Sequence, residues 1–256
     1  MISFAHLVNI VYFLNMKHDS PNLSRTERKR QRKRADILDA SMRLLLEGGI
    51  HHVTVHRIAN AMDLTVGALY RYFPSKDALN GALTRRVLED CTSSLTSALT
   101  AAEGTLLEMS PGEKPVAALS ILAFAYEAFA KRFPGHFYLI TEMMTKPGTI
   151  LPGEERQSAM LIAFQLLDVV EAHIQAAQDQ GAFHPHDARQ RTLMYWSALH
   201  GSLQLYKFSQ SDPQQVPAGD LTHAIAETLL STWASDPELV RPIFSKVRTM
   251  RKESLF

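Results

Sequence analysis

Between Thr54 and Lys76 the sequence gathers polar side chains that can contact a phosphate backbone. The hydroxyls of Thr54 and Thr65 can bind phosphate oxygens, and each residue can also begin a helix whose first N–H groups favour an anion. Lys76 can add a point charge to the same set. This chemistry suits a polyanion such as double-stranded DNA.

The residues between the second threonine and the lysine can contact base edges. Arg71 can reach guanine or a phosphate, and apolar side chains at Val66 and Ala68 can contact thymine methyl groups. Gly67 has no side chain, so that a partner can approach its backbone closely. We therefore place this short segment in a major groove.

Charge is distributed unevenly along the 256 residues, although the formal total is only +1. Residues 17–90 carry a net +5, residues 91–240 a net −8 and residues 241–256 a net +4. A polyanion would therefore meet the first third and the tail. Seven cations fall within ten positions, a run that on its own is typical of a solvated, flexible arm: Arg25, Arg28, Lys29, Arg30, Arg32, Lys33 and Arg34.

Other reactive residues give no comparable pattern. Cys91 is the single cysteine, which excludes a disulfide within the chain and a multi-cysteine metal site, and fits a reducing cytoplasm. The histidines cluster at His51, His52 and His56 and again at His184 and His186, but neither spacing matches a metal site. We predict a protein that is not an enzyme and has no metal and no cofactor.

Helical signals surround the predicted DNA-contacting segment. An apolar helix follows the basic run and ends at Gly48–Gly49, with the periodic residues Ile37, Leu38, Ser41, Leu44 and Leu45. Thr54 caps a second helix, Asp63 allows a tight turn, and Thr65 caps a third helix that runs from Val66 to Tyr72. Ser75 can cap a long fourth helix. Two short helices around a tight turn predict a helix-turn-helix unit.

The segment Thr54–Leu79 resembles the DNA-binding region of the TetR/AcrR family of transcriptional regulators, with similarity from about Arg34 to Val87. Asp63 and Thr65 stand where that family usually has Gly and Ser, and both replacements keep the required geometry. The resemblance implies that Tyr70 and Tyr72 supply hydroxyls near phosphates, unless one of them packs under the helix. Leu64, Leu69 and Phe73 are the expected core of this small domain.

The remaining two-thirds of the chain has helical patterns and no convincing strand. Breaks are expected at Gly104–Pro115, Lys146–Gly153, Gly181–His186 and Ser209–Gly219, and Asp187 and Asp220 can cap the helices that follow two of them. We predict an all-α protein of about nine to ten helices, the tenth running from Pro237 towards Met250. Its parts are an N-terminal extension over 1–24, a three-helix DNA-binding domain over 25–80, a helical effector-binding and dimerisation domain over 81–236, and a basic C-terminal tail over 237–256.

The segment Tyr195–Gly201 resembles a Trp-x-x-x-His-Gly motif of one TetR subgroup. The resemblance implies a homodimer whose interface is a four-helix bundle of Asp187–Phe208, Leu221–Ala234 and their copies. Gly201 and Ser202 are small enough for close helix approach.

The resemblance further implies a pocket for a small hydrophobic or aromatic effector within the second domain. Each candidate lining residue could instead be simple core: Phe124, Phe129, Phe137, Met143, Met144, Met160, Phe164, His173, Trp196 and His200. The expected function is that of a cytoplasmic repressor that leaves a palindromic operator when the effector binds.

The first fifteen residues bear on the alternative function. Met1–Asn15 is largely apolar and uncharged, but too short for a membrane span. Translation from Met16 would make these residues an artefact of gene prediction or a loose tail; otherwise they are a weak membrane or partner anchor. We expect no stable membrane insertion. The alternative function is a structural DNA-binding or membrane-associated protein of the same fold that senses no small molecule.

Overall fold

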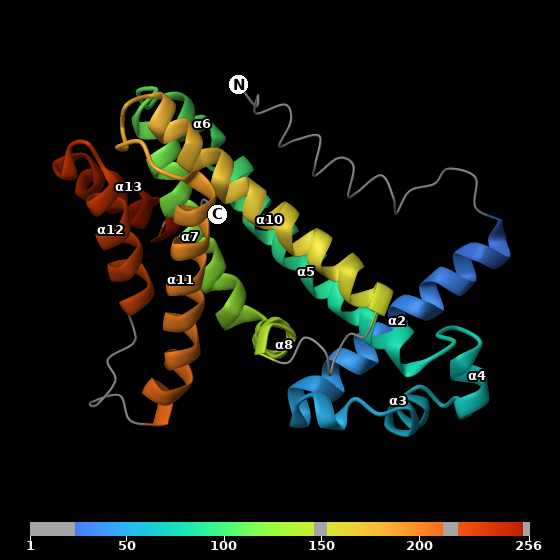
Figure 1. The fold of residues 1–256 in the computed structure, drawn as a ribbon. Coiled ribbons are helices and arrows are strands. Elements are labelled where there is room, and N and C mark those ends of the chain that lie inside the picture. Colours follow the sequence, from blue (N-terminus) through green and yellow to red (C-terminus); the bar gives the residue numbers. More distant parts are fainter. Residues whose placement is uncertain (1–23, 146–152, 212–219, 253–256) are drawn as a thin grey trace. The chain divides into compact units, whose positions relative to one another are not determined.

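The structure is a computed structural model that describes residues 24–145, 153–211 and 220–252. Over these residues it is helical and contains no strand, with eleven α-helices and two short 3-10 helices (Figure 1). The predicted all-α class is confirmed. Most of the expected N-terminal extension over 1–24, and most of the breaks expected at Lys146–Gly153 and Ser209–Gly219, lie outside the described residues. Gly153 and Ser209–Ser211 are helical instead.

The described chain divides into two compact units, each with its own contacts. The first unit contains residues up to Cys91 together with 131–163, and the second contains residues 92–130 and everything from Phe164 onward. The sequence placed a boundary at residue 80, whereas the first unit also takes in a later helix, α8.

The first unit combines complete helices with the starts of two long helices that continue into the second unit. Its elements are α2 (Arg25–Gly48), the 3-10 helix η1 (Ile50–His52), α3 (Val55–Ala61), α4 (Val66–Tyr70), the start of α5 (Lys76–Ala101), α8 (Pro134–Thr145) and the start of α10 (Gly153–Asp179). The apolar positions predicted on α2 are buried at Ile37, Leu44 and Leu45. Gly49 has φ +71° and ends this helix, as predicted.

The basic run is a correction to the sequence-based expectation of a flexible arm. It forms the first turns of α2, which begins at a capping box: Ser24 Oγ accepts a hydrogen bond from the N–H of Glu27, and Glu27 accepts one from the N–H of Ser24. This reciprocal pair of hydrogen bonds satisfies two N–H groups at the start of the helix. The helix therefore begins at Arg25 and includes the whole basic run.

The second unit is a helical bundle. It contains the rest of α5 and α10, α6 (Glu103–Leu107), α7 (Glu113–Arg132), α11 (Ala188–Ser211), α12 (Leu221–Trp233), the 3-10 helix η2 (Pro237–Leu239) and α13 (Val240–Lys252). Helix α7 is buried on almost every side from Pro115 to Glu127. Helices α11 and α12 pack together, and a 2.9 Å hydrogen bond joins Ser202 to Thr222 between them.

Two of three local expectations in the second unit need correction. The predicted break after Gly104 contains α6, because the hydrogen bonds of Ala102 to Ala98 and Leu106 to Ala102 continue from α5, and glycine only weakens a helix. Asp220 stands at the start of α12 but makes no side-chain cap; its carboxylate lies 3.9 Å from Nδ1 of His223. The tenth helix expected from Pro237 towards Met250 is present as η2 and α13, and α13 buries Val240, Ile243, Phe244, Val247 and Met250.

One stretch of α10, Gln157–Asp179, is long and apolar enough to cross a membrane by length and composition. A single such stretch is weak support for a membrane span, because core helices of soluble proteins pass the same test.

Candidate nucleic-acid interface

The helix-turn-helix forms as the sequence predicts. Oγ1 of Thr54 accepts a hydrogen bond from the N–H of Arg57, and Oγ1 of Thr65 accepts one from the N–H of Ala68, so both threonines cap their helices. Between α3 and α4, Asp63 has φ +52°, and it is the non-glycine residue with positive φ in the described chain. This left-handed residue closes the tight turn that sets α4 against α3.

Helix α4 has one buried side and one open side. Leu69 is almost fully buried, as is Phe73 just beyond the helix, while Leu64 is only half-buried. Gly67, Tyr70 and Arg71 are exposed, and Val66 and Ala68 are half-buried. The expected base-reading residues therefore share the helix that also holds the small domain's core residue.

Gly67 faces open space. No atom lies within 4 Å of the position that a Cβ would occupy there. A side chain at this position would meet whatever docks on α4 rather than another part of the unit. The glycine thus leaves the backbone of α4 accessible to a partner.

The two tyrosines differ in their surroundings. Tyr70 is 41% exposed, whereas Tyr72 is half-buried and its backbone carbonyl accepts a hydrogen bond from Nη1 of Arg34. Lys76, the first residue of α5, is exposed beside Ser75, whose Oγ accepts a hydrogen bond from the N–H of Ala78. Tyr70 and Lys76 are thus open to a partner, and the predicted cap at Ser75 is present.

Two arginines of α2 contact the carboxyl end of α4, a link that sequence reasoning missed. Arg30 Nη2 donates a 3.4 Å hydrogen bond to the carbonyl of Arg71, and Arg34 packs its guanidinium 4.2 Å from the ring centroid of Phe73. Burial lowers the pKa of Arg34, and the nearby charges of Arg30 and Arg85 lower it further. The spacing i, i+4 of the two arginines signals one helix face, but the carbonyl partners about forty residues away leave no local trace.

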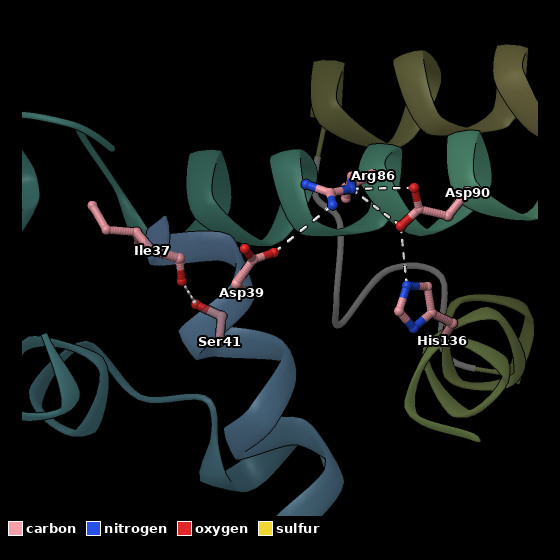
Figure 2. Close-up of polar contacts among 6 residues, drawn as sticks. All are labelled: Ile37, Asp39, Ser41, Arg86, Asp90 and His136. Carbon is pink, nitrogen blue, oxygen red and sulfur yellow. Dashed lines mark hydrogen bonds and ion pairs between the residues drawn. The ribbon is translucent and has the colours of Figure 1, made fainter. Parts of the chain in front are cut away.

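A second set of polar contacts joins three helices of the first unit (Figure 2). Arg86 on α5 lies 3.8 Å from Asp39 on α2 and donates from Nε to both carboxylate oxygens of Asp90 at 3.1 and 3.2 Å. Oδ2 of Asp90 also lies 3.1 Å from Nε2 of His136 on α8 (Figure 2). Since α8 packs on α2 as well, these contacts tie α2 and α5 to α8.

The residues proposed for the effector pocket are divided between the two units. Phe137, Met143, Met144 and Met160 belong to the first, while the other six of the ten belong to the second: Phe124, Phe129, Phe164, His173, Trp196 and His200. Phe124, Phe129, Phe137 and Met143 are buried. Met144 is 39% exposed and Phe164 is 42% exposed, with the Arg189 guanidinium 5.6 Å from the Phe164 ring, so these two positions are open to solvent in the protomer.

The predicted Trp196 and His200 lie together. Their rings stack with centroids 5.3 Å apart, and Nδ1 of His200 shares a 2.8 Å hydrogen bond with the hydroxyl of Tyr126 on α7. Burial lowers the pKa of His200 to about 4, so that its ring is neutral at pH 7. Sequence reasoning missed Tyr126, because its place on a helix gives no sign of a partner 74 residues away.

His173 on α10 is a second neutral histidine. Burial lowers its pKa to about 4, and its Nε2 is buried with no hydrogen-bond partner among the described residues. A polar ligand could supply the missing partner, and such an atom is the kind of feature expected in a binding site.

Phe124 packs in a way that explains its burial without an effector. Its ring stacks on His223 at 3.9 Å and lies 5.9 Å from that of Phe244. His223 and Arg251 both contact the buried carboxylate of Glu127, at 2.9 and 2.7 Å. Phe124 is therefore part of the contacts that hold α12 and α13 on α7.

A shallow surface depression of about 500 Å³ lies elsewhere in the second unit. None of the proposed effector-binding residues lines it; its lining is Ala224, Glu227, Thr228, Ser231, Thr232, Pro237 and Arg241. Within the described ranges, no group of three or more His, Cys, Asp or Glu residues is placed to hold a metal ion.

Family models match both parts of the chain. The model for bacterial regulatory proteins of the tetR family matches residues 37–83, and that for the tetracyclin repressor-like C-terminal domain matches residues 119–232. The first match covers the helix-turn-helix described above, and the second covers most of the helical bundle.

Relatives and solved structures agree with these matches. The chain is 33% identical to the HTH-type transcriptional repressor KstR of Rhodococcus jostii over 49% of this chain and 50% of that protein. It is 31% identical to the nucleoid occlusion factor SlmA of Haemophilus ducreyi over 47% of this chain and 53% of that protein. The chain thus spans about half the length of these two relatives. A TetR family regulator from Agrobacterium tumefaciens has the same fold, with a TM-score of 0.61 at 17% identity over 80% of this chain and 100% of that one.

Proposed function

Because this chain belongs to the TetR family of bacterial regulatory proteins, we propose that it is a homodimeric transcriptional regulator that binds a specific palindromic DNA site. The observation that carries the proposal is helix α4, which is capped by Thr65, anchored by Leu69 and open at Gly67, Tyr70 and Arg71. A small-residue helix of this kind can lie in a major groove with its backbone close to the bases.

The proposed phosphate contacts flank α4. Thr54 and Thr65 present hydroxyls beside the first N–H groups of α3 and α4, and Lys76 presents an exposed ammonium group. Tyr70 adds an exposed hydroxyl, while Tyr72 is the weaker candidate because it is half-buried. We assign base contacts to Val66, Gly67, Ala68 and Arg71. We assign phosphate contacts to Thr54, Thr65, Tyr70, Tyr72 and Lys76.

The proposed dimer forms through α11 and α12. Met194, Ser197, Gly201 and Leu205 are all exposed along one face of α11, and Met194 and Leu205 are 45% and 43% exposed. Gly201 has no atom within 4 Å of a Cβ position, so that a second helix can approach closely. Such a face suits a two-fold interface, and a two-fold dimer places two copies of α4 on a palindrome.

The proposed regulation is repression that a small molecule relieves. Repression is supported by the similarity to KstR, which is named a transcriptional repressor. The match covers half of that protein. His173, with its buried Nε2, and the buried Tyr126–His200 pair support an effector with few polar groups, because both histidine rings are neutral. The two α4 helices of a dimer must stand at one separation to fit the operator. An effector that favours a different separation would release the DNA.

The similarity to a nucleoid occlusion factor favours a second candidate function. In that alternative, the chain is a structural DNA-binding protein of the same fold that senses no small molecule. Anchoring by Met1–Asn15 would extend it to a membrane-associated protein; these residues lie outside the described structure. Deleting residues 1–15 tests the membrane-associated form of this alternative. Unchanged localisation and unchanged DNA binding in the deletion variant would dismiss it.

We propose no catalytic reaction for this chain. Cys91 is fully buried, and burial raises the pKa of its thiol, so that it is a poor nucleophile. We place the regulator in the cytoplasm, where its DNA is.

An electrophoretic mobility-shift titration on the DNA upstream of its own gene tests the proposed function. We expect a shift at moderate salt that unlabelled specific DNA competes away and scrambled DNA does not. A small molecule that abolishes this shift would support the regulator over the structural alternative. The absence of any sequence-specific shift would contradict the proposal.

A further inference from the structure

Helix α4 needs support at its carboxyl end. It has only five residues, too few to be stable alone, and the last carbonyl groups of a helix have no partners within it. Its amino end is fixed by the cap at Thr65 and its middle by Leu69. Just past its carboxyl end, at the C-cap Arg71 and at Tyr72, the backbone carbonyls accept hydrogen bonds from another helix.

Two cations of α2 supply the donors. Arg34 Nη1 donates to the carbonyl of Tyr72, and Arg30 Nη2 donates to that of Arg71. The same Arg34 guanidinium lies 4.2 Å from the ring centroid of Phe73, which is buried and therefore fixed. Arg34 thus contacts two consecutive residues at the exit of α4 by two different surfaces of one planar group.

Most other cations of the run are placed differently. Arg25, Arg28 and Arg32 are exposed along α2, whereas Arg34 is half-buried, as is its neighbour Lys33. Burial and the charges of Arg30 and Arg85 lower the pKa of Arg34, so the unit holds this side chain in place at an electrostatic cost. A group whose role is to bind phosphate gains nothing from such burial, while a group that supports a neighbour does.

We propose that Arg34 is a positioning residue that fixes the angle of the DNA-reading helix α4 from its carboxyl end, with Arg30 assisting, and that it binds no phosphate itself. This inference rests on the proposed DNA-binding function. It divides the basic run into cations that hold the reading helix and cations that meet the polyanion.

Salt dependence separates the two roles. Each phosphate contact that a variant loses reduces the slope of log K against log salt by about 0.9, whatever the DNA sequence. A positioning residue instead changes specific binding and leaves the slope and non-specific binding close to those of the wild type. Arg32→Ala is the matched control, because Arg32 is an exposed cation on the same helix.

The test measures binding of Arg34→Ala, Arg34→Lys and Arg32→Ala to specific and scrambled duplexes over a range of salt. We expect Arg34→Ala to weaken specific binding about tenfold with an unchanged slope, and Arg32→Ala to weaken both kinds of binding alike with a reduced slope. Arg34→Lys keeps the charge, but an ammonium group lacks the planar guanidinium that stacks on the Phe73 ring while donating to the carbonyl of Tyr72. This variant should therefore also lose specific binding. If Lys restores binding fully, or if Arg34→Ala lowers both kinds of binding equally, Arg34 is a phosphate ligand and the inference is wrong.

Amide hydrogen exchange gives a readout that does not require DNA. The N–H groups of Tyr72 and Phe73 both donate to the carbonyl of Leu69, and we expect them to exchange faster in Arg34→Lys, while that of Met62 at the end of α3 is unchanged. Unchanged exchange at Tyr72 and Phe73 would overturn the positioning role. If exchange at Tyr72 and Phe73 is faster in Arg34→Lys but the wild type does not bind DNA specifically, the proposed function fails and the positioning role stands.

Discussion

In the segment proposed to read DNA, single residues separate the support of α4 from the proposed contacts with DNA. On α4, Leu69 is buried and Tyr70 next to it is exposed, so that adjacent positions carry opposite roles. At Thr54 and Thr65 one hydroxyl caps a helix and remains near the surface where a phosphate would lie. These roles are set by local geometry and can be tested one side chain at a time.

Tyr70 provides the first such test. Because its side chain is 41% exposed and packs little within the unit, Tyr70→Ala should weaken operator binding while shifting the free energy of unfolding by less than about 0.5 kcal/mol. Mobility-shift titration and urea denaturation measure the two effects. Leu69→Ala is the control and should cost about 2–5 kcal/mol of stability, since Leu69 is buried. A similar stability loss for Tyr70→Ala would show that Tyr70 is core.

His200 connects stability to pH. Its folded-state pKa of about 4 lies below the ordinary value of 6.5, so the unfolded chain binds a proton that the folded chain does not between these values. The contribution of this neutral ring to stability is therefore fully present above pH 6.5 and is lost as the pH falls towards 4, by an amount on the order of 3 kcal/mol. Urea midpoints from pH 7.5 to 4.5 should decline less steeply in His200→Gln than in wild type. Identical slopes would contradict the neutral, buried state of this ring.

At the scale of the element, what the sequence could predict was what short-range chemistry determines. The caps at Thr54, Thr65, Ser75 and Asp187 could be predicted because each needs only the next three residues. The helical state of the basic run was missed because charge density alone favours solvation, although the capping box of Ser24 and Glu27 is a local signal that could have predicted it.

Longer-range contacts explain the remaining differences from prediction. Arg34 finds its partner at Tyr72, His200 finds Tyr126, and Asp220 leaves its cap position beside His223. Each pairing depends on which helices pack together, and one sequence read alone does not fix that packing. For the same reason, apolar periodicity could nominate Phe124 and Phe164 for a pocket but could not show that one packs on His223 and the other is exposed.

Two glycines test the helix boundaries by contrast. Gly49 ends α2 at φ +71° with the Tyr138 hydroxyl 3.2 Å from a Cβ position, so Gly49→Ala should lower stability by about 1 kcal/mol, or roughly 2–4 °C in Tm. Gly67 has open space and no positive φ, so Gly67→Ala should leave Tm unchanged or slightly raised.

The same pair should separate in DNA binding. In Gly67→Ala the added methyl group stands where a partner meets α4, and we expect weaker specific binding without loss of stability. Differential scanning calorimetry and mobility-shift titration on both variants give the comparison. Normal operator affinity in Gly67→Ala would show that the backbone of α4 does not approach the DNA closely at this residue.

At the scale of the whole molecule, the near-zero net charge of +1 is an average of unlike segments. The cations gather in residues 17–90 and 241–256, and the acidic excess lies in residues 91–240. In α13 the apolar side is buried and Arg241, Lys246 and Arg248 are exposed, so the basic carboxyl end belongs to a packed helix. An acidic body disfavours non-specific contact with DNA and leaves binding to the reading helices.

The most direct test of the central claim measures how many protomers bind one operator and how that affinity depends on salt. Analytical ultracentrifugation with labelled operator should give two protomers per palindromic half-site pair, and the affinity should exceed that for scrambled DNA by at least about 10³-fold. Fluorescence anisotropy from 50 to 200 mM salt should give a steep negative slope of log K against log salt. Equal affinity for operator and scrambled DNA, or binding by a single protomer with no salt dependence, would contradict the account.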